Sequence, residues 1–300
     1  MVSLTLGGLG VIVAGGILGV ELIERGVLHG KSTHDKLDGA CSVDVPRLTF
    51  GPVGPMTSSS FQSTARNRVV GYTIAWPPGF GPGDELPLIV MLHGDGGSHT
   101  SAIKGMTAAQ LVAITSPGKE GSPNTAVPTA IVTVDGGNGY WHPHPGDDPM
   151  GMVVNELIPL CQSKELGKPN RGIGLMGISM GGYGALAIAE HYPHLARAVA
   201  AISPAIWATY GQAQGVNARA YTDAQEFDTY NAITHAAALE EIPVRVVSGI
   251  DDPFHPGVQA FADVAPRGTK VIFSSGCHTE PFFTAQEPAS VAFLSNYFSG

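Results

Sequence analysis

Ser179 stands at the centre of residues 177–181, which read Gly-Ile-Ser-Met-Gly. An apolar run (173–178) leads up to the serine, and a run of small residues (181–190) follows it. This order predicts a strand, a sharp turn and a helix, with the serine hydroxyl held up in the turn at the edge of a sheet. The first N–H groups of that helix would face any negative charge that develops on a bound carbonyl. The pattern therefore predicts a nucleophilic serine.

A serine hydroxyl is a poor nucleophile at neutral pH, and it needs a base whose tautomer is fixed by a third group. In an open α/β sheet such groups emerge at the carboxyl ends of strands. His278 is the one histidine among eleven that directly follows the last apolar run, and Asp251 and Asp252 follow the run before it. We favour Asp252 as the acid because Pro253 would stiffen its turn, which leaves Asp251 as a solvated turn residue or a cap. The predicted catalytic residues are thus Ser179, Asp252 and His278.

Two backbone N–H groups are expected to form an oxyanion hole beside the serine. One belongs to Met180, the residue after the nucleophile. The other should lie in the loop after the apolar run 88–92, where residues 93–97 read His-Gly-Asp-Gly-Gly, and we assign it to Asp95. The Asp95 carboxylate should then point away from the hole or be paired. His93 is expected to support the loop, not to act in catalysis.

Two stretches rich in aromatic residues should border the same crevice. The loop at 135–144 follows an apolar run and could contact an acyl or alcohol group. The stretch at 204–241 is longer than one crossover needs, so it is either a small lid or pocket wall, or a crossover whose aromatics pack onto the sheet. The predicted substrate contacts are Gly94, Tyr140, Trp141 and Trp207.

His142, His144, Asp147 and Asp148 raise the question of a metal site in the first of these stretches. Prolines separate these residues, and they lack a helical spacing, so the pattern argues against such a site. We expect neither a metal ion nor a cofactor.

Apolar runs alternate with helix-like stretches along most of the chain. The predicted strands lie at 58–63, 69–76, 88–92, 130–134, 173–178, 198–202, 244–248 and 271–273. The predicted helices lie at 107–115, 150–161, 182–191, 231–239, 257–264 and 288–298. Continuous apolar runs suit parallel strands that are covered on both faces. The alternation therefore predicts an α/β fold, with a mostly parallel central sheet, helices on both faces and a small lid-like insertion.

Residues 2–20 carry no charge, and their number is close to that needed to cross a bilayer. The cations that precede the apolar part of a signal peptide are missing. We expect an export signal or membrane anchor at 1–23, and hence a secreted or cell-envelope protein, with a buried helix as the alternative. A linker at 24–56 and a catalytic domain at 57–300 should follow, with the insertion at 204–241 inside that domain.

The chain has 300 residues, a formal net charge of −9 and only 16 Lys and Arg residues, with no basic cluster. Nucleic-acid binding is disfavoured, because neutralising phosphates requires clustered cations. Three cysteines, Cys41, Cys161 and Cys277, are too few for a disulfide framework. One bridge is possible if the chain is exported; the alternative is unpaired cysteines that behave as small apolar residues.

Together these motifs resemble the esterase branch of the α/β-hydrolases. The resemblance lies in five short segments: 92–94, 135–137, 177–182, 252–254 and 276–278. The branch includes S-formylglutathione hydrolases, feruloyl esterases and the mycobacterial mycolyltransferases. The sequence is most similar to secreted, esterase-like proteins of actinobacteria.

The resemblance covers residues 58–298 and implies an α/β-hydrolase fold, an acyl-serine intermediate, ester substrates and no cofactor. Ser179, Asp252 and His278 match the triad positions of the family, in its order of nucleophile, acid and base. Phe282 stands where many relatives carry tryptophan, a departure that should bear on the shape of the pocket.

We therefore expect a serine carboxylic-ester hydrolase that acts on a small-molecule or lipid ester. One alternative is an envelope acyltransferase that passes the acyl group to a sugar or glycolipid hydroxyl. Another is a non-catalytic envelope protein that keeps the fold for binding, against which the intact order of serine, acid and histidine argues. The sequence does not decide between water and a sugar as the acceptor, because the same triad serves both.

Overall fold

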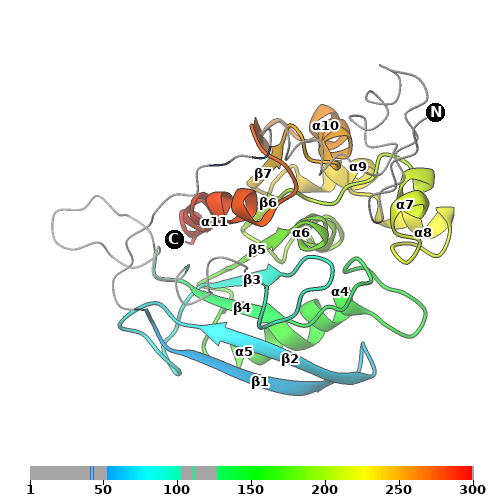
Figure 1. Cartoon of the computed structure of the whole chain (residues 1–300). Helices are drawn as coiled ribbons and strands as arrows, with labels where there is room; N and C mark the ends of the chain where they lie inside the picture. The colour runs from blue at the N-terminus through cyan, green and yellow to red at the C-terminus, as the bar shows by residue number, and fades with distance from the viewer. Residues whose placement is uncertain (1–40, 42, 44–52, 103–110, 112–126, 299–300) are drawn as a thin grey trace, which may run out of the picture.

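Eight strands form one sheet at the centre of the computed structural model, which describes residues 41, 43, 53–102, 111 and 127–298 (Figure 1). The strands are β1 (Met56–Ser63), β2 (Arg68–Ala75), β3 (Leu88–Leu92), β4 (Ala130–Val134), β5 (Ile173–Ile178), β6 (Ala198–Ile202), β7 (Val244–Gly249) and β8 (Lys270–Ser274). Each coincides with a predicted strand, with small shifts at the ends.

The strand order is β1-β2-β4-β3-β5-β6-β7-β8. β2 pairs antiparallel with β1 and β4, whereas every later neighbour pair is parallel. The predicted mostly parallel sheet is confirmed. Because parallel strands end at the same edge, the loops that follow Leu92, Val134, Ile178 and Gly249 gather there.

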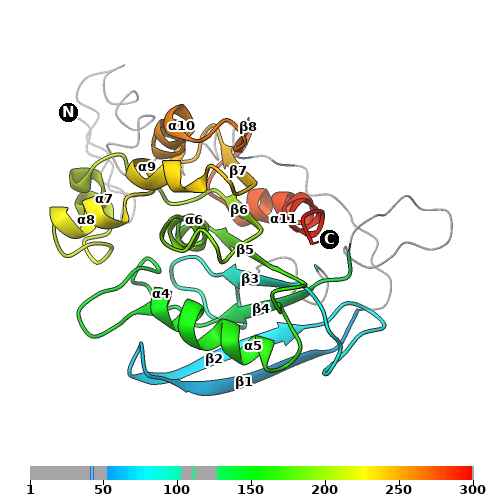
Figure 2. The same ribbon diagram turned by 180° about the vertical axis from the view of Figure 1, so that it is seen from behind.

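Helices cover both faces of this sheet, with α6 on one side and α11 on the other (Figures 1 and 2). The described helices are α4 (Pro149–Met152), η1 (Val153–Leu157), α5 (Ile158–Gln162), α6 (Met180–His191), α7 (Tyr210–Val216), α8 (Ala224–Tyr230), α9 (Ala232–His235), η2 (Ala236–Leu239), α10 (His255–Val264) and α11 (Glu280–Ser295).

The strand side chains alternate between two buried clusters. Leu88 and Val90 of β3 belong to the larger cluster, which α6 covers, and Ile89 and Met91 belong to the smaller one, which α11 covers. All four side chains are fully buried. This double burial explains why the strands read as continuous apolar runs and not as alternating ones.

The last helix begins earlier than predicted. α11 starts at Glu280, and Pro288, the predicted start, lies inside it. Phe282 and Thr284, in the first turns, are buried. Their packing outweighs the hydrogen bond that an internal proline removes. The helix predicted at 107–115 lies almost wholly outside the described residues.

The stretch 204–241 folds into short helices; the predicted helix at 231–239 corresponds to α9 and η2, whereas the sequence pattern did not reveal α7 and α8. Their starts are capped by side chains, with Thr209 on α7, Asp223 on α8 and Asn231 on α9. α7 and α8 lie together at one end of the molecule (Figure 1). Local capping thus compensates for helices too short to be stable by themselves.

The apolar segment 2–20 lies outside the described residues, as do most of the positions predicted to be a linker. Among the helices that the structure describes, none combines the length and apolar character needed to span a bilayer. The boundaries predicted at 23 and 56 therefore stay predictions.

Glu287 is an unusual member of the core. It lies on α11 with its side chain fully buried, and its carboxylate oxygens have no hydrogen-bond partner among the described residues. Burial, with the nearby Glu280 as a smaller cause, raises the pKa of Glu287 to about 9. The native protein therefore holds a proton here at neutral pH that the unfolded chain releases.

Glu287→Gln is expected to make the protein more resistant to alkaline conditions. Between the unfolded pKa of 4.5 and the folded pKa of about 9, the native state binds the extra proton, so its stability falls as pH rises. The variant lacks this dependence, so its stability relative to the parent should grow by about 4 kcal/mol between about pH 5 and about pH 8. Urea unfolding at both pH values measures this difference in the free energy of unfolding. Glu241→Gln, at an exposed site, is the control; a parallel response of all three proteins would contradict the assignment.

Candidate active site

Ser179 occupies the turn between β5 and α6, as the predicted order of strand, turn and helix requires. Its backbone has φ 56° and ψ −121°, a conformation that costs a non-glycine residue about 1–3 kcal/mol. A Cβ on Gly177 would come within 2.0 Å of the Gly181 carbonyl oxygen, and one on Gly181 within 2.1 Å of the Leu92 oxygen. Glycine at both positions therefore lets strand, turn and helix pass this closely.

The structure brings Ser179, His278 and Asp252 together. His278 Nε2 lies 2.8 Å from Ser179 Oγ, and His278 Nδ1 lies 2.9 Å from Asp252 Oδ2. A carboxylate only accepts, so Nδ1 carries the imidazole hydrogen, and Nε2 accepts the hydrogen bond from the serine hydroxyl. Asp252 is almost fully buried, and its Oδ1 accepts from the N–H of Phe254 at 2.8 Å. The neighbouring Asp251 is not the residue that meets the imidazole.

The loop after β3 approaches the serine as predicted. Gly97 N–H donates to the Gly94 carbonyl at 3.0 Å, which closes a turn with Asp95 at its second position, and Gly96, at φ 72°, adopts the conformation that favours glycine. A Cβ on Gly94 would lie 3.4 Å from Ser179 Cβ. Asp95 is exposed, so water solvates its carboxylate. Met180 is the first residue of α6, so its N–H has no acceptor within the helix.

The imidazole of His93 holds this loop in place through two hydrogen bonds. Its Nδ1 donates to the Gly94 carbonyl at 2.7 Å, and its Nε2 accepts from the N–H of Gly136 at 2.9 Å. Burial lowers the pKa of His93, which favours the neutral ring that this pair of bonds requires. His93 thereby connects the loops that follow β3 and β4.

Two cavities open beside Ser179, and both are bordered by Ser179, Asp95 and His278. The first has a volume of about 310 Å³, and its other lining residues include Gly94, Ile178 and Phe283. The second has a volume of about 510 Å³, and its other lining residues include Tyr140, Met180, Trp207, Val216 and Arg219. Three of the four predicted substrate contacts, Gly94, Tyr140 and Trp207, therefore line a cavity. The insertion supplies part of the second wall, and its Tyr221 and Phe227 are buried.

Trp141 differs from the expectation of a substrate contact. Its side chain is fully buried, its Nε1 donates to the His93 carbonyl at 3.1 Å, and it does not line either cavity. A Cβ on Gly136 or Gly184 would collide with the indole ring, so both glycines make room for it. Trp141 thus fills the space under the loops.

A second expectation is also wrong: Phe282, which stands where many relatives carry tryptophan, does not shape the pocket. Its ring is fully buried against Gly276, where a Cβ would come within 2.3 Å of it. The next residue, Phe283, lines the first cavity and packs edge-on to the His278 imidazole, with ring centroids 4.9 Å apart. Helix α11 thus turns one phenylalanine into the core and the other to the cavity.

The candidate metal residues of the sequence separate into two pairs. Arg66, which is buried, binds both oxygens of Asp147, at 2.7 and 2.9 Å, and Asp148 caps α4 by accepting from Gly151 N–H at 2.7 Å. These two carboxylates are therefore engaged in holding the loop after β4. His142 and His144 instead face helix α8.

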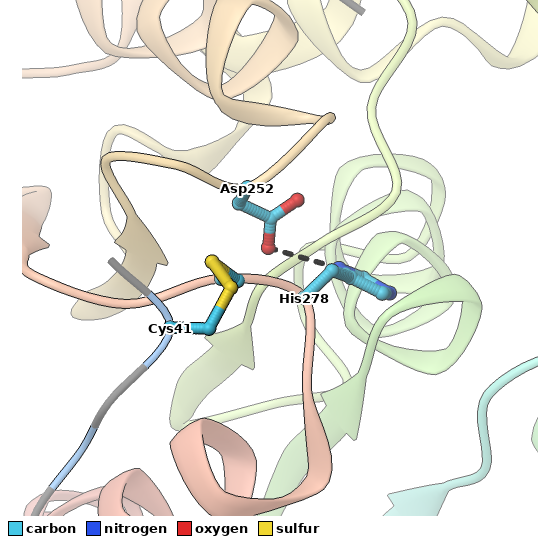
Figure 3. Close-up of a disulfide and its surroundings, with 4 residues drawn as sticks. Cys41, Asp252 and His278 are labelled. Atoms are coloured by element: carbon cyan, nitrogen blue, oxygen red, sulfur yellow. Dashed lines mark hydrogen bonds and ion pairs between the residues drawn. A yellow bond between two sulfur atoms is a disulfide. The ribbon is translucent and has the colours of Figure 1, made fainter. Parts of the chain in front are cut away.

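A disulfide joins Cys41 to Cys277, the residue immediately before His278 (Figure 3). Of the two alternatives left open by the sequence, a single bridge is the one observed, and Cys161 is free and buried. Cys277 itself is nearly fully buried. The bridge therefore ties a distant part of the chain to the turn that presents the imidazole to Asp252.

Cys41→Ser is expected to lower the free energy of unfolding by about 2–5 kcal/mol, because the bridge closes a very long loop. Thermal unfolding with and without a reductant measures this effect. Reductant should bring the parent close to the variant and leave the variant unchanged. Equal stability of the oxidised parent and the variant would show that the bridge adds nothing to stability.

Three residues important to this arrangement were given no role in the site by the sequence analysis. Phe254 packs beside His278 at a centroid distance of 5.0 Å, Arg66 holds the loop after β4 through Asp147 and the Asp135 carbonyl, and Arg219 borders the second cavity. Only Phe254 carried a signal, because it directly follows the predicted acid and Pro253.

A model of the family described as "Putative esterase" matches residues 63–286 of the chain. A comparison with curated proteins found no match. Similar solved structures include a ferulic acid esterase, at 17% identity and a TM-score of 0.68, over 82% of this chain and 100% of that chain. An S-formylglutathione hydrolase from Agrobacterium tumefaciens is 16% identical with a TM-score of 0.63, over 84% and 98% of the two chains.

An α/β-hydrolase from the metagenome of Lake Arreo, Spain, is 16% identical with a TM-score of 0.61, over 92% of each chain. At these identities the likeness is one of fold, and it confirms the α/β-hydrolase architecture. Because the family model spans well over half of the sequence, the protein belongs to this esterase family and is an enzyme of that class.

Proposed function

We propose that the protein hydrolyses carboxylic esters through an acyl-serine intermediate on Ser179. The observation that carries this proposal is the pair of short contacts from the His278 imidazole, 2.8 Å to Ser179 Oγ and 2.9 Å to Asp252 Oδ2, at the mouth of two cavities. Hydrogen-bond distances of this size already allow proton transfer without a movement of the backbone.

The proposed steps follow from this geometry. His278 Nε2 takes the proton of Ser179 as its oxygen attacks the ester carbonyl, and Asp252 stabilises the imidazolium that forms. The N–H groups of Asp95 and Met180 donate hydrogen bonds to the oxyanion of the tetrahedral intermediate. Each donor lowers the activation barrier by about 3 kcal/mol. His278 then protonates the leaving alcohol, and later activates the water that releases the acid.

The two cavities suit the two parts of an ester substrate, the acyl chain and the alcohol. An ester bound with its carbonyl at Ser179 must send its acyl and alcohol parts in different directions. Apart from Ser179, Asp95 and His278, the two cavities are lined by different residues. The first is bordered by Ile178 and Phe283, which suits a short apolar acyl chain. The second is larger and contains Arg219, which suits a polar alcohol.

A secreted or envelope location belongs to the same proposal. A disulfide persists in oxidising compartments, so the Cys41–Cys277 bridge supports export of the chain. The apolar segment 2–20 would supply the signal or the anchor.

The test uses the purified protein with p-nitrophenyl esters of graded chain length and with a fluorophosphonate probe. We expect turnover that declines with long acyl chains, and probe attached to Ser179 on peptide mapping. Product analysis with and without a sugar acceptor distinguishes hydrolysis from acyl transfer to the sugar. A folded protein that neither turns over any ester nor reacts with the probe would overturn the proposal and favour a binding role.

A further inference from the structure

Three potential metal ligands converge where the loop after β4 meets helix α8 of the insertion. His144 Nδ1 lies 3.1 Å from Glu226 Oε1, and His142 Nδ1 lies 3.8 Å from the same oxygen. One ligand atom from each of the three residues lies within 4.8 Å of the other two. The group comes from two separate segments of the chain, so only the fold assembles it.

Backbone carbonyls orient both imidazole rings. His142 Nε2 lies 2.8 Å from the Ala220 carbonyl oxygen, and His144 Nε2 lies 2.6 Å from that of Gly139. A carbonyl oxygen only accepts, so a neutral ring that donates to it from Nε2 presents a lone pair on Nδ1. Histidines that bind metals are held in the same way, with the non-ligating nitrogen donating to a carbonyl or carboxylate.

The Glu226 side chain is oriented by Thr222, which lies just before the start of helix α8. Its Oε2 accepts from the backbone N–H of Thr222 and from the Thr222 hydroxyl, the latter at 2.6 Å. This leaves Oε1 turned toward the two histidines. The Glu226 side chain is only 12% exposed, so little water reaches the carboxylate to solvate it.

With both rings neutral and their hydrogens on Nε2, the cluster brings together acceptors only. Two Nδ1 lone pairs face one carboxylate oxygen, and the Pro143 carbonyl oxygen lies 3.2 Å from His142 Nδ1. Such an arrangement is repulsive unless a cation lies among the atoms. Either an added proton on an imidazole or a bound metal ion would supply that charge.

We propose that His142, His144 and Glu226 bind a divalent transition-metal cation, and that zinc is the ion that fits best. Two imidazoles and one carboxylate form a ligand set that suits zinc, whereas calcium and magnesium prefer oxygen ligands alone. His142 is fully buried, but His144 and Glu226 are 15% and 12% exposed, which leaves a route for the ion and a place for a water ligand.

The bound ion would hold the wall of the second cavity. Tyr140 precedes the histidines on their loop, and residues 216–219 precede Glu226 in the insertion; both border that cavity. A metal shared by the two segments would fix the distance between them. The site is thus structural, and its chemistry is separate from that of Ser179.

The expectation of no metal came from a sequence pattern in which Asp147 and Asp148 were the partners of the two histidines. Both aspartates are engaged with other groups. The third ligand, Glu226, lies far along the chain and has no regular spacing to the histidines that would mark it in the sequence.

The test measures zinc binding to the whole purified protein after treatment with a chelator. Competition with a chromophoric chelator should show one tight site, and zinc should raise the melting temperature. Glu226→Gln and His144→Gln should weaken binding by more than about tenfold, and Thr222→Val, which loosens Glu226, by about tenfold. His194→Gln removes an exposed histidine and should bind zinc like the parent.

Two further measurements distinguish this site from zinc bound at the catalytic histidine and from a proton held by the cluster. Cobalt in place of zinc should give a visible absorption spectrum that Glu226→Gln changes and His278→Gln does not. Zinc binding that disappears in His278→Gln would place the ion at the ester site and overturn the proposal. Failure of the parent to bind zinc more tightly than Glu226→Gln would mean that a proton alone balances the cluster, which also overturns it.

Discussion

Ser179→Ala is expected to lower kcat for ester hydrolysis by roughly 10⁵- to 10⁶-fold, the size of loss seen when a triad nucleophile is removed. The His278 imidazole would remain bonded to Asp252 but would face a methyl group, so no acyl-enzyme can form. Folding should survive, because alanine at φ 56° is strained to the same degree as serine. Activity against a short p-nitrophenyl ester, with circular dichroism to verify the fold, measures both parts.

Two companion variants sharpen this result. Ser179→Gly should be as inactive as the alanine variant yet at least as stable as the parent, because glycine adopts φ 56° without strain. Ser101→Ala removes another hydroxyl that lines the first cavity and should keep activity within a few-fold. Turnover by Ser179→Ala at a rate similar to that of Ser101→Ala would exclude Ser179 as the nucleophile.

The sheet could be predicted because parallel strands buried on both faces appear as continuous apolar runs. The strand Leu88–Leu92 is an example, since all five of its residues are buried. Helix ends were harder to predict. Pro288 resembles a helix start, yet α11 runs through it because Phe282 packs into the core within the first turn of the helix.

The catalytic candidates could be predicted because each follows the end of a strand, where topology gathers polar groups. Ser179, Asp252 and His278 come after β5, β7 and β8, and the structure places them in contact. Contacts that depend on packing gave no such signal. The bridge from Cys41 and the burial of Trp141 follow from distances between distant segments, which no local pattern encodes.

Glu226 was missed for the same physical reason. Its role depends on where the insertion comes to rest against the loop after β4, and short capped helices such as α8 leave little periodicity in the sequence. His142 and His144 were visible as a pair, but a pair of histidines needs a third ligand before it indicates a metal. Only the fold supplies that ligand.

Asp252→Asn is expected to lower kcat by about 10⁴-fold with little change in KM. The Phe254 N–H donates to Oδ1 of Asp252 at 2.8 Å, so in the variant it would hold the amide oxygen there and turn the NH₂ group toward His278. The imidazole would then accept at Nδ1 and carry its hydrogen on Nε2, facing the serine with the wrong tautomer. Steady-state kinetics on a short ester give kcat and KM separately.

Asp251→Asn is the matched control, since it makes the same chemical change one residue away, and it should stay within a few-fold of the parent. If the two variants lost activity equally, the loss would reflect the charge of the loop and not the tautomer of His278. If Asp252→Asn kept full activity, the 2.9 Å contact between His278 and Asp252 would have no part in the reaction. A large loss confined to Asp252→Asn is the outcome that the buried, doubly bonded carboxylate requires.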